Sequence, residues 1–113
     1  MHYFQGTIKE ANEIIDLGFY ISIARPIFRL PHLQEVVSEI PIANIVIETD
    51  SAPQPFKKNR DNWTEPHYLR SITKKIAELK DMDEASVETA LFYNTKQLLS
   101  HRWGILNKYV PDL

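Results

Sequence analysis

The sequence contains no cysteine among its 113 residues. Disulfide bonds, thiolate catalysis and thiolate metal sites are therefore excluded, and the absence fits a reducing compartment. No apolar run approaches the roughly 18 residues that a membrane-spanning helix requires, and the first residues lack the pattern of a signal peptide. We therefore expect a soluble, cytoplasmic protein that does not associate with a membrane.

The chain also lacks an excess of charge of either sign. Its 13 Lys and Arg residues against 15 Asp and Glu residues give a formal net charge of −2 and a pI near 6.1. This balance excludes a strongly basic nucleic-acid-binding domain but leaves room for a local basic patch. Hydrophobic residues make up 43% and charged residues 25% of the chain, which is typical of a globular protein. The length fits one domain, residues 1–113, and is too short for a complete large barrel.

Helical and extended apolar patterns alternate in the first half of the chain. Thr7 and Glu10 have the spacing of a capping box, which predicts a helix that ends at Gly18. Three elements are expected next, a strand, a short helix and a second strand: residues 19–24, 31–40 and 44–49. The apolar residues of both strands are nearly continuous, as in parallel sheets covered by helices. The sequence therefore predicts an α/β fold.

Two amphipathic helices are expected in the second half. The first begins near Thr64-Glu65-Pro66, because a proline in the first helical turn loses no hydrogen bond. Asp83 is expected to cap the second helix, which ends near Ser100. Its inward-facing residues are expected to be Val87, Leu91, Leu98 and Leu99. The tail, residues 101–113, is expected to be irregular.

The second expected strand ends in two carboxylates, Glu48 and Asp50. The carboxyl ends of parallel strands form the face where ligands and catalytic groups gather. Asp50 can bind a divalent cation there, activate water, or cap the turn of Ser51-Ala52-Pro53. Glu48 projects from the same side of the strand and can support Asp50 or pair with a basic group.

Two further features carry candidate chemistry. His2 lies just ahead of a glycine turn and a helix start, where an isolated histidine is most often a solvent-exposed residue. Lys57, Lys58 and Arg60 follow Asp50 on a long polar loop. They form either a solvated surface or a contact with DNA phosphates.

Five segments carry a family resemblance: His2-Tyr3-Phe4-Gln5-Gly6-Thr7, Gly18-Phe19-Tyr20-Ile21-Ser22, Glu48-Thr49-Asp50-Ser51-Ala52-Pro53, Glu65-Pro66 and Asn94-Thr95-Lys96-Gln97-Leu98. In this order they resemble TatD-like metal-dependent deoxyribonucleases over residues 2–99. The resemblance implies a (β/α)8 TIM-type barrel that hydrolyses phosphodiester bonds with divalent metal ions, either magnesium, manganese or zinc. It implies that His2 and Asp50 lie in the metal site, and that Asp50 orients or deprotonates the attacking water.

The family pattern contains more metal-site residues than this chain does. An H-x-H pair, a glutamate and a further histidine have no counterpart here, since His32, His67 and His101 lie on expected helices or the tail. The resemblance therefore implies the carboxyl-terminal portion of a barrel, about three βα units, that carries part of the site.

Three functions remain open at this point. The first is a TatD-like hydrolase that acts on DNA or another phosphodiester. The second is a non-catalytic truncated barrel module, which forms a homo-oligomer or binds the missing barrel half, because a partial barrel leaves strand edges unpaired. The third is an amidohydrolase-type enzyme for a small molecule, and Glu48-Thr49-Asp50-Ser51 favours the first over it.

Overall fold

The centre of the fold is a pair of short parallel strands, β1 (Ile21–Ile23) and β2 (Ile45–Ile47). The computed structural model describes residues 1–51 and 64–110. Ile21 pairs with Ile45 and Ile23 with Ile47. The parallel pairing, with a helix in the connection, confirms the α/β class.

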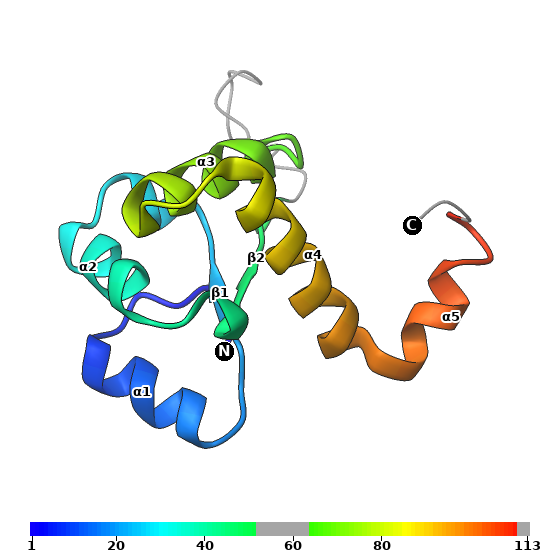
Figure 1. Ribbon diagram of the computed structural model, residues 1–113, viewed down its shortest axis with the longest axis horizontal. Coiled ribbons are helices and arrows are strands. Elements are labelled where there is room, and N and C mark those ends of the chain that lie inside the picture. The colour runs from blue at the N-terminus through cyan, green and yellow to red at the C-terminus, as the bar shows by residue number, and fades with distance from the viewer. Residues whose placement is uncertain (52–63, 111–113) are drawn as a thin grey trace, which may run out of the picture.

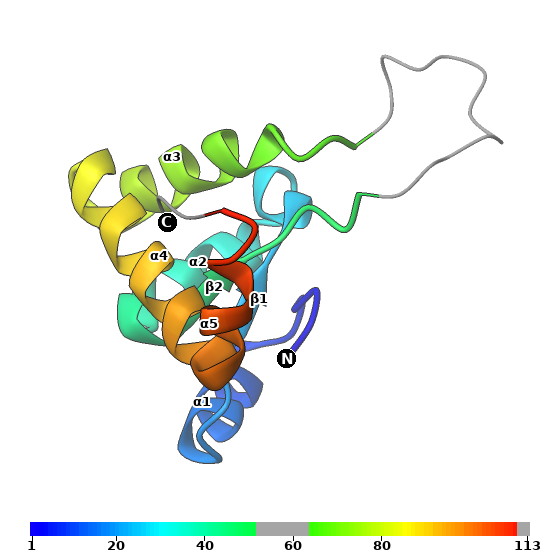
Figure 2. The same ribbon diagram turned by 90° about the vertical axis from the view of Figure 1, so that its right-hand side faces the viewer.

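Helices surround this pair on more than one side (Figures 1 and 2). They are α1 (Ile8–Asp16), α2 (Pro31–Glu39), α3 (Tyr68–Lys80), α4 (Glu84–Leu99) and α5 (Trp103–Leu106), with short 3-10 turns at Arg25–Phe28, Ile42–Asn44 and Ser100–Arg102. α1 contacts β1, α4 packs beside β2, and α3 packs against both α2 and α4. Figure 1 shows α1 and α2 on one side of the strands and α4 on the other. Among the described residues, no helix is both long and apolar enough to cross a bilayer.

The first four residues extend the sheet on the edge of β1 that faces away from β2. The Ser22 N–H donates to Met1 O, and the Phe4 N–H donates to Ser22 O, both at 3.0 Å. On the opposite edge, the Glu48 N–H donates to Ile23 O at 3.0 Å. These bonds follow the pattern of a parallel ladder, so the N-terminal segment occupies the place of a third strand.

The two faces of the strand pair differ in chemistry. Ile21, Ile23 and Ile45 are fully buried and join one hydrophobic cluster with residues of α2, α3 and α4. Since side chains alternate along a strand, Ser22 lies on the other face. Ser22 is paired with Val46, and Glu48, the residue after β2, is two positions further along the chain. The polar residues of both strands therefore share the face away from the core.

Local signals placed the ends of α1 correctly. The Thr7 side chain accepts from the Glu10 N–H, and the Glu10 carboxylate accepts from the Thr7 N–H at 2.7 Å, which completes the predicted capping box. Gly18 follows the helix with a φ of +82°, a conformation that glycine adopts at low cost. A Cβ at Gly6 would lie 2.7 Å from Glu10 Oε2 and 2.8 Å from the ring of the buried Phe4, so a larger residue there would force these side chains to shift.

Several predicted boundaries and orientations are wrong. Both strands are shorter than expected, and α3 begins at Tyr68, so Pro66 lies in the preceding turn. Leu98 is 53% exposed, because the buried side of α4 is formed by Val87, Leu91 and Asn94. The tail is helical over Ser100–Leu106 rather than irregular. Trp103 anchors it by packing edge-on against Phe92 at 5.5 Å between ring centroids.

Candidate metal centre

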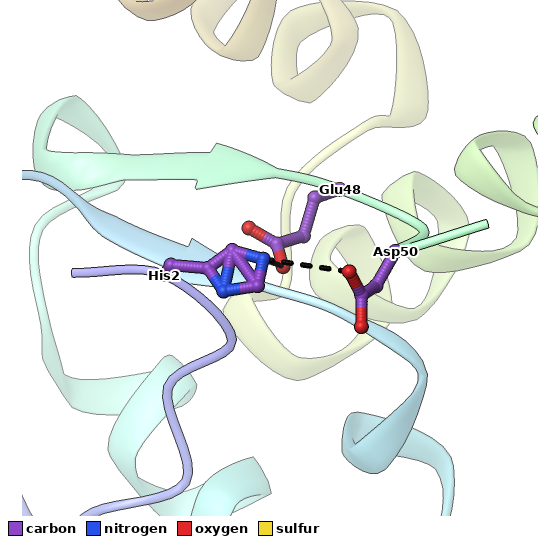
Figure 3. Close-up of side chains that lie close together, drawn as sticks. All are labelled: His2, Glu48 and Asp50. Atoms are coloured by element: carbon purple, nitrogen blue, oxygen red, sulfur yellow. Dashed lines mark ion pairs between the residues drawn. The ribbon is translucent and has the colours of Figure 1, made fainter. Parts of the chain in front are cut away.

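Three polar side chains meet at the carboxyl end of β2. His2 comes from the N-terminal segment beside β1, whereas Glu48 and Asp50 follow β2 directly. Figure 3 shows the imidazole pointing toward both carboxylates. One ligand atom from each residue lies within 4.8 Å of the other two. The segments that carry them are 46 residues apart in sequence and are brought together by the strand order.

The imidazole is closest to Glu48. His2 Nε2 lies 2.9 Å from Glu48 Oε1 and 3.6 Å from Asp50 Oδ1. The predicted convergence of His2 and Asp50 is therefore confirmed by the geometry, while their binding of a metal stays a prediction. His2 and Asp50 are exposed and Glu48 is mostly covered. The site thus opens to solvent on one side and has a shielded carboxylate at its base.

Glu48 is held in place by its neighbour on β1. The Ser22 hydroxyl donates a hydrogen bond to Glu48 Oε2, which fixes the orientation of the carboxylate. The other oxygen, Oε1, is buried and has no hydrogen-bonding partner in the described part of the chain besides the nearby imidazole. A buried carboxylate oxygen in that position requires a proton or a cation between itself and the imidazole nitrogen.

The backbone turns sharply at Asp50, which has a φ of +53°. Thr49 Oγ1 accepts from the Ser51 N–H at 3.3 Å, and the Asp50 side chain faces His2. The expected capping of the turn Ser51-Ala52-Pro53 by Asp50 extends beyond the described residues and stays a prediction. A non-glycine residue in this conformation carries backbone strain, which recurs at functional sites.

The donor set fits a divalent cation. One imidazole nitrogen and two carboxylate oxygens suit zinc and manganese, and the two carboxylates also suit magnesium. Two ligands at about 2.1 Å from one ion are roughly 3 to 3.5 Å apart. The observed separations of 2.9 Å and 3.6 Å bracket that range. Glu48 Oε1, whose one polar neighbour among the described residues is the His2 imidazole, is where such an ion would bind.

The remaining histidines lie elsewhere. His32 Nε2 is 3.0 Å from Gln5 O, and His67 Nδ1 is 3.3 Å from Glu65 Oε2. His101 is exposed on the 3-10 turn after α4. The basic cluster of Lys57, Lys58 and Arg60 lies outside the described residues, so its role stays a prediction.

Sequence reasoning missed Ser22. Glu48 was expected either to support Asp50 or to pair with a basic group, and its carboxylate is the closer of the two to the His2 imidazole. The sequence signal for Ser22 was that it is the single polar residue between two isoleucines in β1. In the structure it pairs with Val46 of β2. Without the register of the strands, nothing in the sequence links Ser22 to Glu48.

Comparison with known proteins identifies relatives of this chain. The family model described as TatD related DNase matches residues 1–100. The uncharacterized metal-dependent hydrolase YabD of Bacillus subtilis is 35% identical over 103 residues, which are 87% of this chain and 39% of that protein. Mouse TATDN3, named as a candidate deoxyribonuclease, is 30% identical over 109 residues, which are 96% of this chain and 36% of that protein.

Two solved structures share the fold. The crystal structure of YJJV, a TatD homologue from Escherichia coli, matches with a TM-score of 0.75 at 24% identity and covers 87% of this chain and 39% of that chain. A TatD family hydrolase from Entamoeba histolytica matches with a TM-score of 0.70 at 21% identity, covering 82% of this chain and 39% of that one. The chain therefore spans about two fifths of the length of these relatives, which is consistent with the expected partial barrel.

Proposed function

We propose, because this chain belongs to the family of TatD related DNases, that it supplies part of a metal-dependent phosphodiesterase site that acts on DNA. The observation that carries the proposal is the meeting of His2, Glu48 and Asp50 around one point at the carboxyl end of β2. The metal-dependent hydrolase class follows from the family, and the DNA substrate and the roles of individual residues are our proposal.

The three residues would divide the work by their environments. His2 and Glu48 would hold a divalent ion, since the Ser22 hydroxyl fixes the Glu48 carboxylate and leaves Oε1 facing the imidazole. A bound ion would make a water nucleophilic near neutral pH and offset negative charge on the phosphoryl oxygens. Asp50, the more exposed carboxylate, would orient the attacking water and accept its proton.

A nuclease assay tests this function. The 113-residue chain is incubated with a single-stranded oligodeoxynucleotide and manganese or magnesium. Hydrolysis is expected to fall at least about a hundredfold in Asp50→Asn, as for loss of a catalytic base. Asp81→Asn is the matched control, because Asp81 is exposed and has nearly the same backbone conformation, with a φ of +51° against +53° for Asp50. Equal rates in Asp50→Asn and the parent would reject the role of Asp50.

The second candidate function is a non-catalytic module that needs a partner. In the residues that the structure describes, the sheet has the order β1-β2, and β2 has no partner strand on its other edge. The polar face of the sheet carries Ser22 and Glu48, which a closed barrel would place inside. We propose that the chain corresponds to the carboxyl-terminal portion of a TIM-type barrel, about three βα units, whose open edge is covered by a second copy or by the missing half.

Sedimentation velocity separates the two candidates. A chain that requires a partner is expected to form a dimer or larger species at micromolar concentration, or to sediment as an expanded monomer. A compact monomer with a cooperative unfolding transition would contradict the need for a partner. A compact monomer that binds metal and hydrolyses DNA would leave the enzyme as the remaining function.

A further inference from the structure

A polar cavity of about 500 Å³ lies next to the candidate metal centre. Its polar lining residues are Tyr3, Arg25, Arg29, Thr49, Asp50 and Thr64. Asp50 belongs to both sites, and Tyr3 is adjacent in sequence to His2. The volume lies within the range of about 300 to 1,000 Å³ that is typical of small-molecule sites. The cavity is therefore large enough for a nucleotide beside the metal-binding residues.

Arg25 is held rigidly at the wall of this cavity. Its Nη1 donates to Thr64 Oγ1 at 3.0 Å, and its Cζ lies 4.6 Å from the centroid of the Tyr68 ring. Stacking on an aromatic ring and one hydrogen bond fix the plane of the guanidinium. A guanidinium has five N–H donors, and within residues 1–51 and 64–110 one hydrogen bond of Arg25 is observed, to Thr64. The side chain is thus oriented before any ligand arrives, which lowers the entropic cost of binding.

The charge balance of the cavity favours an anion. Arg25 and Arg29 bring two positive charges, whereas Asp50 is the one acidic residue on the described lining. In the described part of the chain, neither guanidinium forms an ion pair. Arginine forks match the geometry of phosphate oxygens, and the lining also carries the hydroxyl-bearing residues Thr49 and Tyr3. Paired donors of this kind distinguish a phosphate subsite from a solvated loop.

We propose that this cavity is a phosphate subsite, in which Arg25 and Arg29 bind a phosphate group of the substrate adjacent to the phosphodiester that is cleaved. The assignment of this phosphate to a substrate rests on the proposed function, whereas the binding of phosphate itself does not. Arg25 is the fixed donor, and Arg29, which is exposed, adds attraction from the rim. Asp50 separates this subsite from His2 and repels the anion as long as its charge is not compensated.

Phosphate binding in the absence of metal provides the test. Inorganic phosphate and thymidine 5′-monophosphate are titrated into the full chain with a chelator at low salt, and binding is followed by NMR shifts of the backbone amides. Arg25→Met is expected to weaken binding by about tenfold to a hundredfold, the loss typical of a charge-assisted bond. The affinity of Arg25→Lys should lie between those of the parent and Arg25→Met, because lysine keeps the charge but lacks the paired N–H donors of the guanidinium. Asp50→Asn should strengthen binding, since it removes the opposing charge.

Matched controls keep each outcome informative. Arg70→Met removes an exposed arginine of α3 that does not line this cavity, and it should leave the affinity unchanged. Arg29→Met serves if Arg25→Met unfolds, because Arg29 is exposed and outside the contact with Tyr68. Binding that is equal in the parent and Arg29→Met, or equal in Arg70→Met and Arg25→Met, would overturn the proposal, as would the absence of saturable binding by the parent.

The metal-free design separates this inference from the proposed function. If Glu48→Gln loses metal binding but phosphate binding still depends on Arg25, both the metal centre and the phosphate subsite are supported. If phosphate depends on Arg25 and no metal binds to the parent chain, the phosphate subsite stands and the proposed hydrolase fails. If metal binds to the parent but the affinity for phosphate does not change when Arg25 or Arg29 is replaced, the phosphate subsite fails. Arg25 then serves as a structural link between Thr64 and Tyr68.

Discussion

The Ser22 hydroxyl donates a hydrogen bond to Glu48 Oε2 across 26 positions of sequence. This bond joins the middle of β1 to the residue that follows β2, and it leaves the other oxygen of Glu48 facing His2. A serine in the middle of an otherwise apolar strand is thus explained by the site rather than by the core. In metal sites generally, replacing a residue that orients a metal ligand lowers the affinity for the metal, even though that residue does not touch the metal itself.

Ser22→Ala is expected to weaken divalent metal binding by about tenfold to a hundredfold, because the Glu48 carboxylate loses the donor that orients it. The measurement is a manganese titration followed by electron paramagnetic resonance. Ser38→Ala is the control, since the Ser38 hydroxyl bonds the carbonyl of Glu35 on the exposed side of α2. Unchanged affinity in Ser22→Ala would show that Glu48 needs no such support.

Asn94→Ala is expected to reduce the free energy of unfolding by about 2 to 3 kcal/mol. The Asn94 side chain is buried and donates to Ile42 O at 2.8 Å and Ile45 O at 2.7 Å. These bonds connect α4 to the start of β2. The alanine would remove the side-chain donor from both carbonyls, while Ile42 O would keep a second bond, from the Ile45 N–H. Urea denaturation followed by circular dichroism measures the change.

Two further variants make the Asn94 prediction specific. Asn94→Asp should also destabilise, because a carboxylate cannot donate to a carbonyl. Asn12→Ala, on the exposed face of α1, should have little effect. A stability of Asn94→Ala within experimental error of the parent would contradict the role of these two bonds.

The stability of the two capped helices is expected to fall in acid. Hydrogen bonds from the Thr7 backbone and side chain lower the pKa of Glu10 below 4.5, and bonds from the side chain and backbone of Ser86 lower the pKa of Asp83 below 3.8. A carboxyl whose pKa is lower in the folded state binds fewer protons there. Its stabilising contribution is therefore complete above the unfolded pKa and is lost as the pH falls through the folded pKa.

The matched variants for this effect keep the caps and remove the charges. Glutamine serves in a capping box and asparagine is a good N-cap. The melting temperature of the double variant Glu10→Gln and Asp83→Asn should therefore depend less on pH between about pH 2.5 and 5 than that of the parent. Equal slopes in the two proteins would show that other carboxyls govern the acid sensitivity.

Local interactions explain which parts of the fold could be read from the sequence. The Thr7–Glu10 capping box, Gly18 and the Asp83 cap each depend on residues within a few positions, and the structure confirms all three. Leu98 was assigned to the wrong side of α4 because its burial depends on what packs against the helix, and that depends on distant residues. The helical tail was missed for the same reason, since Trp103 contacts Phe92 of the preceding helix.

The candidate site likewise contains residues that could be identified from the sequence and residues that could not. Asp50 was singled out by its place after an apolar strand and His2 by its place before a glycine turn and a helix start. The resemblance added a shared metal site, because these motifs are local in sequence. The closeness of Glu48 to His2 was not predicted, since it follows from the pairing of the N-terminal segment with β1. Arg25 and Arg29 carried no signal of a binding site until the cavity beside Asp50 placed them on one wall.

The central claim is that His2 and Glu48 bind one divalent cation beside Asp50. The most direct measurement is the nitrogen-15 chemical shift of the four histidine side chains by NMR as one equivalent of zinc is added. The shift of His2 Nε2 is expected to change while those of His32, His67 and His101 do not, and Glu48→Gln should abolish the response. An unchanged His2 signal, or an identical response in Glu48→Gln, would contradict the account.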